Sequence, residues 1–110
     1  MIMVVFRSRL RLETTEEYAV WAKEMSALAR QQPGFVLEKT FTASDGERVT
    51  LSIFENEEAV LAWRNHPRHR IAQQLGRERF YAEFNLQVCG ILRDYGFQRE
   101  ESPLLEREML

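Results

Sequence analysis

The sequence predicts a two-layer α+β domain, in which a four-stranded antiparallel sheet packs against helices on one face. Two observations predict this class. Apolar residues alternate with period two in four segments, which is typical of strands, and recur with helical spacing in the segments between them. An Asp-Gly pair joins the second and third strand segments, as in a tight hairpin. The resulting order, β-α-β-β-α-β, is the ferredoxin-like arrangement.

The first part of the chain predicts a strand followed by a helix. Residues 2–12 alternate between an apolar side and a side that carries three arginines, so a strand is expected there. Thr14 and Glu17 have the spacing of a capping box, which predicts a helix start. The apolar stripe of this helix is expected to consist of Tyr18, Trp21, Met25, Leu28 and Ala29. The Pro33-Gly34 pair then ends the helix.

A hairpin is expected next, with strands over residues 35–42 and 48–55. The first of these strands alternates less regularly, because Lys39 interrupts its apolar side. The second carries an alternating apolar set of Val49, Leu51 and Ile53. Between the strands, Asp45-Gly46 supplies the positive φ that a tight turn needs.

The second helical segment is predicted to be broken in two. Asn56 is the expected N-cap of its first part, and the His66-Pro67 pair interrupts it. Since proline favours the first turn of a helix, a third helix is expected from there to about Arg79. The last strand is expected over residues 80–93, with Phe84, Leu86 and Val88 on one side and Asn85, Gln87 and Cys89 on the other.

The composition is that of one globular domain. The chain has 110 residues, of which 45% are hydrophobic and 29% charged. A net charge of −2 argues against nucleic-acid binding, and no segment approaches the ~20 apolar residues of a membrane span. The one cysteine, Cys89, cannot form an internal disulfide and is expected to be inert. We therefore expect a cytoplasmic protein without nucleic-acid or membrane partners, with a domain over residues 1–95 and a tail over 96–110.

The sheet face that the helices leave bare needs a cover. A chain of this length has no third layer to offer, so a second copy is the economical cover, and two-fold symmetry is common in such assemblies. The sequence therefore predicts a homodimer.

The segment around the second and third helices resembles the antibiotic biosynthesis monooxygenase (ABM) domain family. The matching residues are Trp63-Arg64-Asn65-His66-Pro67-Arg68-His69, Gln73, Gly76-Arg77-Glu78 and Phe80-Tyr81, together with Pro33-Gly34-Phe35 and Glu55-Asn56-Glu57-Glu58-Ala59. The resemblance covers roughly residues 2–95. It implies a dimeric α+β barrel. Members of this family include cofactor-free oxygenases of polyketide-like quinols, haem-degrading enzymes and proteins with no assigned activity.

Candidate site residues follow from the chemistry that such a pocket needs. His69 lies on the same helix side as Gln73 and can exchange a proton near neutral pH, and Trp63 can form a wall for a flat ligand. We expect His69, Trp63 and Asn85 to be catalytic, and Ser8, Gln73, Tyr81 and Phe84 to line the pocket. Two alternatives remain open: His69 can serve as a cap or packing residue, and Trp63 can anchor the helix in the core.

Metal and haem sites receive less support from the sequence. His66 and His69 are the only histidines, and no third ligand lies near them in the sequence, so no metal site is expected. In the haem-degrading pattern a histidine follows the tryptophan by ten residues and an asparagine lies on the first strand. Here those positions hold Gln73 and, approximately, Ser8.

The first hypothesis is an ABM-type monooxygenase without a cofactor, acting on a small aromatic or quinol-like molecule. The main alternative is a non-catalytic small-molecule-binding or stress-response protein of the same fold. Haem binding or degradation is the third hypothesis. Oxygen uptake, ligand-induced thermal stabilisation without turnover, and a Soret shift on haem titration distinguish the three.

Overall fold

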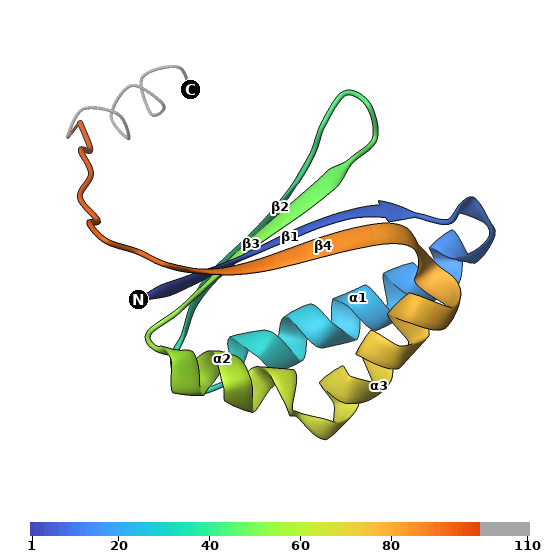
Figure 1. The fold of residues 1–110 in the computed structure, drawn as a ribbon, viewed down its shortest axis with the longest axis horizontal. Coiled ribbons are helices and arrows are strands. Elements are labelled where there is room, and N and C mark those ends of the chain that lie inside the picture. Colours follow the sequence, from blue (N-terminus) through green and yellow to red (C-terminus); the bar gives the residue numbers. More distant parts are fainter. Residues whose placement is uncertain (100–110) are drawn as a thin grey trace, which may run out of the picture.

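A computed structural model describes residues 1–99 and confirms the predicted ferredoxin-like α+β fold (Figure 1). One antiparallel sheet has the strand order β2-β3-β1-β4. The strands are β1 (Ile2–Leu10), β2 (Phe35–Thr42), β3 (Arg48–Phe54) and β4 (Tyr81–Gly90). The helices are α1 (Thr15–Arg30), α2 (Glu57–Arg64) and α3 (Pro67–Leu75), and all three lie on the same side of the sheet (Figure 1).

Two local signals work as predicted. The side chain of Asn56 caps α2 by accepting a hydrogen bond from the Ala59 N–H at 2.9 Å. Gly46 in the β2–β3 turn has a φ of +91°, which a residue without a Cβ adopts freely.

The start of α1 differs from the prediction, because Thr14 does not form a capping box. Its hydroxyl donates instead to the carbonyl of Arg79 at 2.8 Å, and Glu17 forms an ion pair with the Arg79 guanidinium at 2.6 Å. Both side chains that the box requires are therefore used to hold α1 against the segment before β4. The first strand also ends earlier than expected, at a register shift between Arg9 and Leu10.

The third helix also ends earlier than predicted. α3 ends at Leu75, and a π-helical turn, Gly76–Phe80, leads into β4. A Cβ placed on Gly76 would lie 2.8 Å from the Tyr81 ring, so only glycine fits this close approach. The turn includes Phe80, which is 2% exposed and belongs to the core with Ala29, Phe54 and Ala59.

The two faces of the sheet have different neighbours. On β2, Glu38 accepts a hydrogen bond from Ser26 of α1, so the residues that share its side face the helices. Through the strand register this helix-facing side includes Ser52, Thr50 and Arg48 of β3. The opposite side, here called the outer face, carries an apolar set of Met3, Val5, Leu37, Phe41, Val49, Leu51 and Ile53.

Large apolar side chains remain exposed on both faces. On the outer face Phe41 is 50% exposed and Leu37 is 43% exposed. On the helix-facing side of β4, Phe84, Leu86 and Val88 are 40–50% exposed, so the helices leave this edge of the sheet uncovered. Residues 91–99 then run away from the body past the N-terminus (Figure 1).

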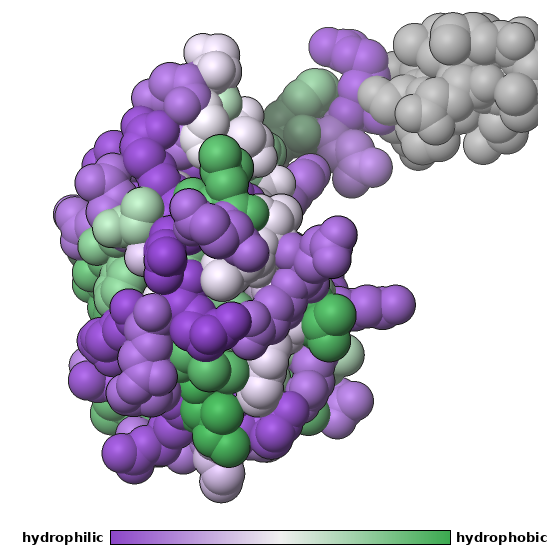
Figure 2. Space-filling model, turned by 90° about the vertical axis from the view of Figure 1, so that its right-hand side faces the viewer, coloured by the Kyte–Doolittle hydropathy of each residue, from purple (hydrophilic) through white to green (hydrophobic). Residues whose placement is uncertain are grey.

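The end of the molecule near the β2–β3 turn is charged. Figure 2 shows a mostly hydrophilic surface there, with small hydrophobic patches between the polar side chains. Arg7 pairs with Glu47 at 2.9 Å, and Arg9 pairs with Asp45 at 2.9 Å and with Glu83 at 3.2 Å. The outer face is therefore apolar toward the chain termini and ionic toward the hairpin.

Candidate functional site

A stacked pair of rings, Trp63 and His69, forms the centre of the candidate site. Trp63 lies near the end of α2 and His69 in the first turn of α3, and the break at His66-Pro67 folds one helix end onto the other. The ring centroids are 4.0 Å apart and the ring planes are inclined by only 14°. Both side chains are half-buried. The structure thus brings together two of the residues that the sequence analysis expects to be catalytic.

Hydrogen bonding assigns the tautomer of His69. Nδ1 lies 2.9 Å from the carbonyl oxygen of Trp63, and because a carbonyl only accepts, Nδ1 carries the proton. Gln73 lies 3.4 Å from the same nitrogen, but its amide group donates to the carbonyl of Arg64 at 3.0 Å. Within residues 1–99, Nε2 has no hydrogen-bond partner. Its lone pair is therefore unpaired within the described part of the chain.

Burial determines the charge of His69. The loss of hydration lowers its pKa, and the nearby His66 adds to this effect, whereas the hydrogen bond to Trp63 and the charge of Glu38 oppose it. The imidazole is therefore neutral at pH 7, with Nε2 as a proton acceptor. Glu38 is itself held in place by Ser26, whose hydroxyl donates to it at 2.8 Å.

A second aromatic group lies on the same side of the sheet. The Tyr81 ring makes edge-to-face contacts with Phe6 at 5.3 Å and Tyr18 at 5.8 Å, and it lies 5.8 Å from Phe84. Ser8 pairs with Phe84 across the strands and is 4% exposed. Burial raises the pKa of Tyr81, with Tyr18 adding to the effect, so the phenol stays protonated. Three of the predicted pocket residues thus lie together.

The strand register gives the distance along the sheet between the Trp63–His69 pair and the group of Ser8, Tyr81 and Phe84. Glu38, whose charge acts on His69, pairs with Ser52. Ser8 pairs with Arg48, four residues earlier on β3. At the rise of an extended strand, these two positions are roughly 13 Å apart.

Asn85 does not lie with the Trp63–His69 pair. It follows Phe84 on β4 and pairs with Arg7, so its side chain belongs to the outer face. Asn85 also borders an open hollow of about 250 Å³, which is lined by residues of both sides of the sheet: Arg7, Ser8, Glu47, Glu83, Phe84 and Asn85. Its predicted catalytic role therefore has no geometric link to His69.

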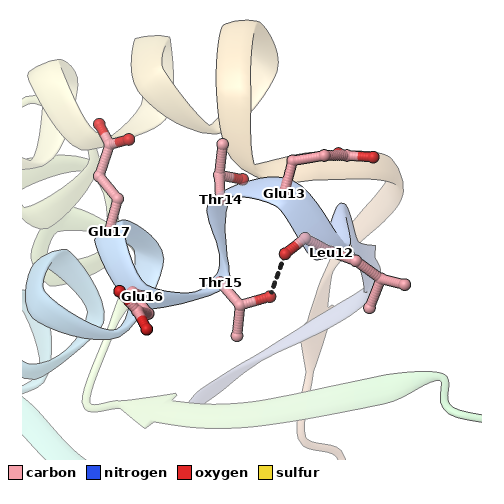
Figure 3. Close-up of a pocket in the computed structure, with 6 residues that line it drawn as sticks. All are labelled: Leu12, Glu13, Thr14, Thr15, Glu16 and Glu17. Carbon is pink, nitrogen blue, oxygen red and sulfur yellow. Dashed lines mark hydrogen bonds between the residues drawn. The ribbon is translucent and has the colours of Figure 1, made fainter.

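A larger surface hollow, of about 570 Å³, surrounds the start of α1 and is lined by residues 12–17 (Figure 3). Figure 3 shows their side chains pointing in different directions rather than into one cavity. The Thr15 hydroxyl donates to the Leu12 carbonyl at 2.9 Å, and Glu17 is already paired with Arg79. The hollow is separate from the Trp63–His69 pair.

Within residues 1–99, no three His, Cys, Asp or Glu side chains are placed to hold a metal ion together. The position at which the haem-degrading pattern has its iron ligand holds Gln73, whose amide group is engaged with Arg64. None of the helices in the described part of the chain has both the length and the apolar content to span a membrane.

The topology and the helix-facing aromatic site define a ferredoxin-like α+β protein with its candidate site between sheet and helices. The chain belongs to the antibiotic biosynthesis monooxygenase family, whose model matches residues 1–75. An uncharacterized Bacillus subtilis protein, YqjZ, is 32% identical over 95 residues, which cover 86% of this chain and 82% of YqjZ.

Solved structures share the fold at low sequence identity. Rv0793 from Mycobacterium tuberculosis is similar with a TM-score of 0.76 and 17% identity, over 86% of this chain and 98% of that one. SnoaB from Streptomyces nogalater, a cofactor-independent oxygenase, is similar with a TM-score of 0.71 and 15% identity, over 84% and 94% of the two chains.

Two charged residues of the helix-facing side, Glu38 and Arg48, were not predicted from the sequence. Glu38 lies close enough to affect the pKa of His69, and Arg48 donates to the Tyr18 hydroxyl at 2.6 Å. A signal for Arg48 was present, because it alternates with the outer-face residue Val49 and therefore belongs to the helix-facing side.

Proposed function

We propose that the protein is a monooxygenase of the ABM type that oxidises a small, electron-rich aromatic molecule without a cofactor. The observation that supports this most is the free Nε2 of a neutral His69 beside a stacked Trp63. Family membership and the similarity to SnoaB support the same reaction class.

The proposed reaction balances without an external reductant. The ring carbon of a phenol loses its hydrogen and becomes a carbonyl carbon. One atom of dioxygen joins this carbon, and the other leaves as water with the ring hydrogen and the phenolic proton. The substrate supplies all four electrons. The protein must therefore remove a proton, hold the ring and exclude bulk water.

Each part of this task has a candidate residue. His69 accepts the phenolic proton at Nε2, and its Nδ1–H bond to Trp63 keeps that nitrogen unprotonated. Trp63 offers an aromatic surface for the substrate ring. We assign Ser8, Tyr81 and Phe84 to the part of the proposed ligand site that is distant from His69, and Gln73 to the part beside His69.

We also propose a homodimer in which the outer faces of two sheets pack together. Apolar side chains such as Leu51 and Ile53 cover much of this face, and Phe41 and Leu37 are 50% and 43% exposed on it. A contiguous apolar surface of this kind is typical of an interface. The domain would comprise residues 1–95 and the tail residues 96–110, and we place the protein in the cytoplasm.

Oxygen uptake tests the proposed reaction. The substrate probe is 1,4-dihydroxynaphthalene, and its spontaneous oxidation is subtracted. We expect uptake that exceeds this background and that falls by about 10²-fold in His69→Ala, as is usual for loss of a general base. Trp63→Phe should lose activity mainly through a higher KM. Uptake that is equal in the parent and in both variants would refute these assignments.

The non-catalytic alternative makes a different prediction. A binding protein of the same fold would be stabilised thermally by the aromatic probe but would consume no oxygen above background. A Soret shift on haem titration would favour the haem hypothesis instead.

A further inference from the structure

Arg48 differs from the other arginines that hold the fold together. Arg7, Arg9, Arg68 and Arg79 each form an ion pair with a carboxylate at 2.6–3.2 Å. Within residues 1–99, no carboxylate lies within 4.0 Å of the Arg48 guanidinium. The cation is therefore half-buried without a charge partner in the described part of the chain.

The surroundings of Arg48 hold it in place without neutralising it. Its Nη1 donates to the hydroxyl of Tyr18 at 2.6 Å, and the guanidinium lies 5.1 Å from the centre of the same ring. Only one of the five N–H groups is used in this bond. The remaining donors are available to a ligand that accepts two hydrogen bonds in one plane, as a carboxylate does.

Further donors lie beside Arg48. Ser8 pairs with Arg48 across β1 and β3, and its hydroxyl has no hydrogen-bond partner within residues 1–99. The protonated Tyr81 phenol lies beside the Tyr18 ring and belongs to the same cluster of hydroxyl groups. A half-buried cation with hydroxyl donors and aromatic walls attracts an anionic group attached to an aromatic body.

We propose that Arg48, together with Tyr18, forms an anion-binding subsite, and that the ligand of this protein is an aromatic molecule with a carboxylate or a comparably acidic group. This inference rests on the proposed function, because it assigns the ligand class of the same helix-facing layer. The subsite lies roughly 13 Å along the sheet from the position of Glu38 near His69. An extended aromatic ligand anchored at Arg48 would therefore present its other end to His69.

A pair of matched probes tests the subsite. Calorimetric titration compares 2-naphthoate with the neutral alcohol 2-naphthylmethanol on the full chain at low ionic strength. We expect the parent to bind the carboxylate at least about tenfold more tightly, as a charge-assisted bidentate bond would give. Arg48→Gln should abolish this preference, and Arg48→Lys should keep part of it.

Two further variants distinguish binding at the Arg48 subsite from the effect of the net charge of the protein. Arg30→Gln removes the same charge from an exposed position of α1 and should leave the preference unchanged. Tyr18→Phe removes the hydroxyl that holds Arg48, and it should weaken naphthoate binding more than binding of the alcohol. It also keeps the test decisive if Arg48→Gln melts below the assay temperature.

The inference is overturned if the parent shows no preference, if neither probe binds, or if Arg48→Gln folds and retains the preference. The titration involves no turnover. A lost preference with intact quinol oxidation would therefore refute the subsite alone, and an intact preference without oxidation would refute only the oxygenase.

Discussion

His69 shows how the environment of one residue sets its chemistry. Its Nδ1–H donates a hydrogen bond to the Trp63 carbonyl, and burial lowers the pKa of the ring. The neutral imidazole with an unprotonated Nε2 is therefore the stable form. Histidines in other surroundings would be protonated at mildly acidic pH. The same burial makes both activity and folding depend on pH.

Stability should fall as the pH drops below about 6.5, the ordinary pKa of histidine. Because the folded state holds His69 at a lowered pKa, the unfolded chain binds more protons between the folded pKa and about 6.5. The stabilisation is complete above this range and is lost as the pH falls through it. Urea unfolding of the parent and of His69→Gln between pH 5 and 7.5 measures this, and the variant should show a weaker pH dependence.

His66→Asn provides a comparison, because asparagine can replace the Nδ1 of His66 that accepts from the Arg68 N–H at the start of α3. Since burial is the main cause of the lowered pKa of His69 and His66 only adds to it, this variant should keep most of the parent's pH dependence. An equal pH dependence in the parent and in His69→Gln would contradict the assigned burial of His69.

Gly34 is the residue at which backbone and packing constraints coincide. Its φ is +85°, and an added Cβ would lie 2.7 Å from the Cβ of Ala59 in α2. We expect Gly34→Ala to cost more than the about 1–2 kcal/mol of left-handed strain alone, since α2 must also move. Gly46→Ala has similar strain but nothing within 4 Å, so it should cost only the strain term. Equal losses in chemical denaturation would show that the contact with Ala59 is unimportant.

At the scale of elements, the chain fixes its helices through contacts distant in sequence. Thr14 donates to the carbonyl of Arg79, and Glu17 pairs with the same residue, so the start of α1 is joined to the π-helical turn before β4. On the other side, Arg68 of α3 binds Glu24 of α1 through two bonds of 2.7 and 2.8 Å.

Thr14→Val should therefore destabilise the fold by about 1 kcal/mol, the usual net value of one hydrogen bond. Thr42→Val, on an exposed position at the end of β2, is the control and should have little effect. Thermal unfolding of both variants measures the difference. If Thr14 acted only as a cap of α1, Thr14→Val would not loosen the segment around Arg79. Amide exchange at the neighbouring Tyr81 would then be the same in the variant and the parent.

The element order could be predicted because it depends on local patterns. Alternation in the strands, the Asn56 cap and the Asp45-Gly46 turn are all read from neighbouring residues, and the structure agrees with each. The π-helical turn could not be predicted, because it depends on the packing of Gly76 against the Tyr81 ring.

The candidate site could be predicted only in part for the same reason. Trp63 and His69 were expected together from a short segment, and they stack. The position of Asn85 on the outer face follows from strand alternation. That Arg48 has no ion-pair partner within residues 1–99 depends instead on which carboxylates the fold brings near. Which side chains distant in sequence come close in space cannot be read from neighbouring residues.

At the scale of the whole molecule, residues 1–99 leave the outer face of the sheet uncovered. Leu51→Lys places a charge at the centre of this face without disturbing the helix side, so it should convert the dimer into a monomer that still folds. Leu12→Lys, at an 87% exposed position away from the face, is the control and should remain dimeric. Sedimentation velocity over a range of concentrations measures both, and a parent protein that is monomeric throughout would contradict the proposed interface.

Isotope labelling tests whether the protein oxidises an aromatic substrate at the Trp63–His69 site. The parent and His69→Ala are incubated with 1,4-dihydroxynaphthalene under ¹⁸O₂, and the product is analysed by mass spectrometry. We expect the parent product to carry one oxygen atom from dioxygen and this product to be nearly absent with the variant. A product without the label, or equal labelling with both proteins, would contradict it.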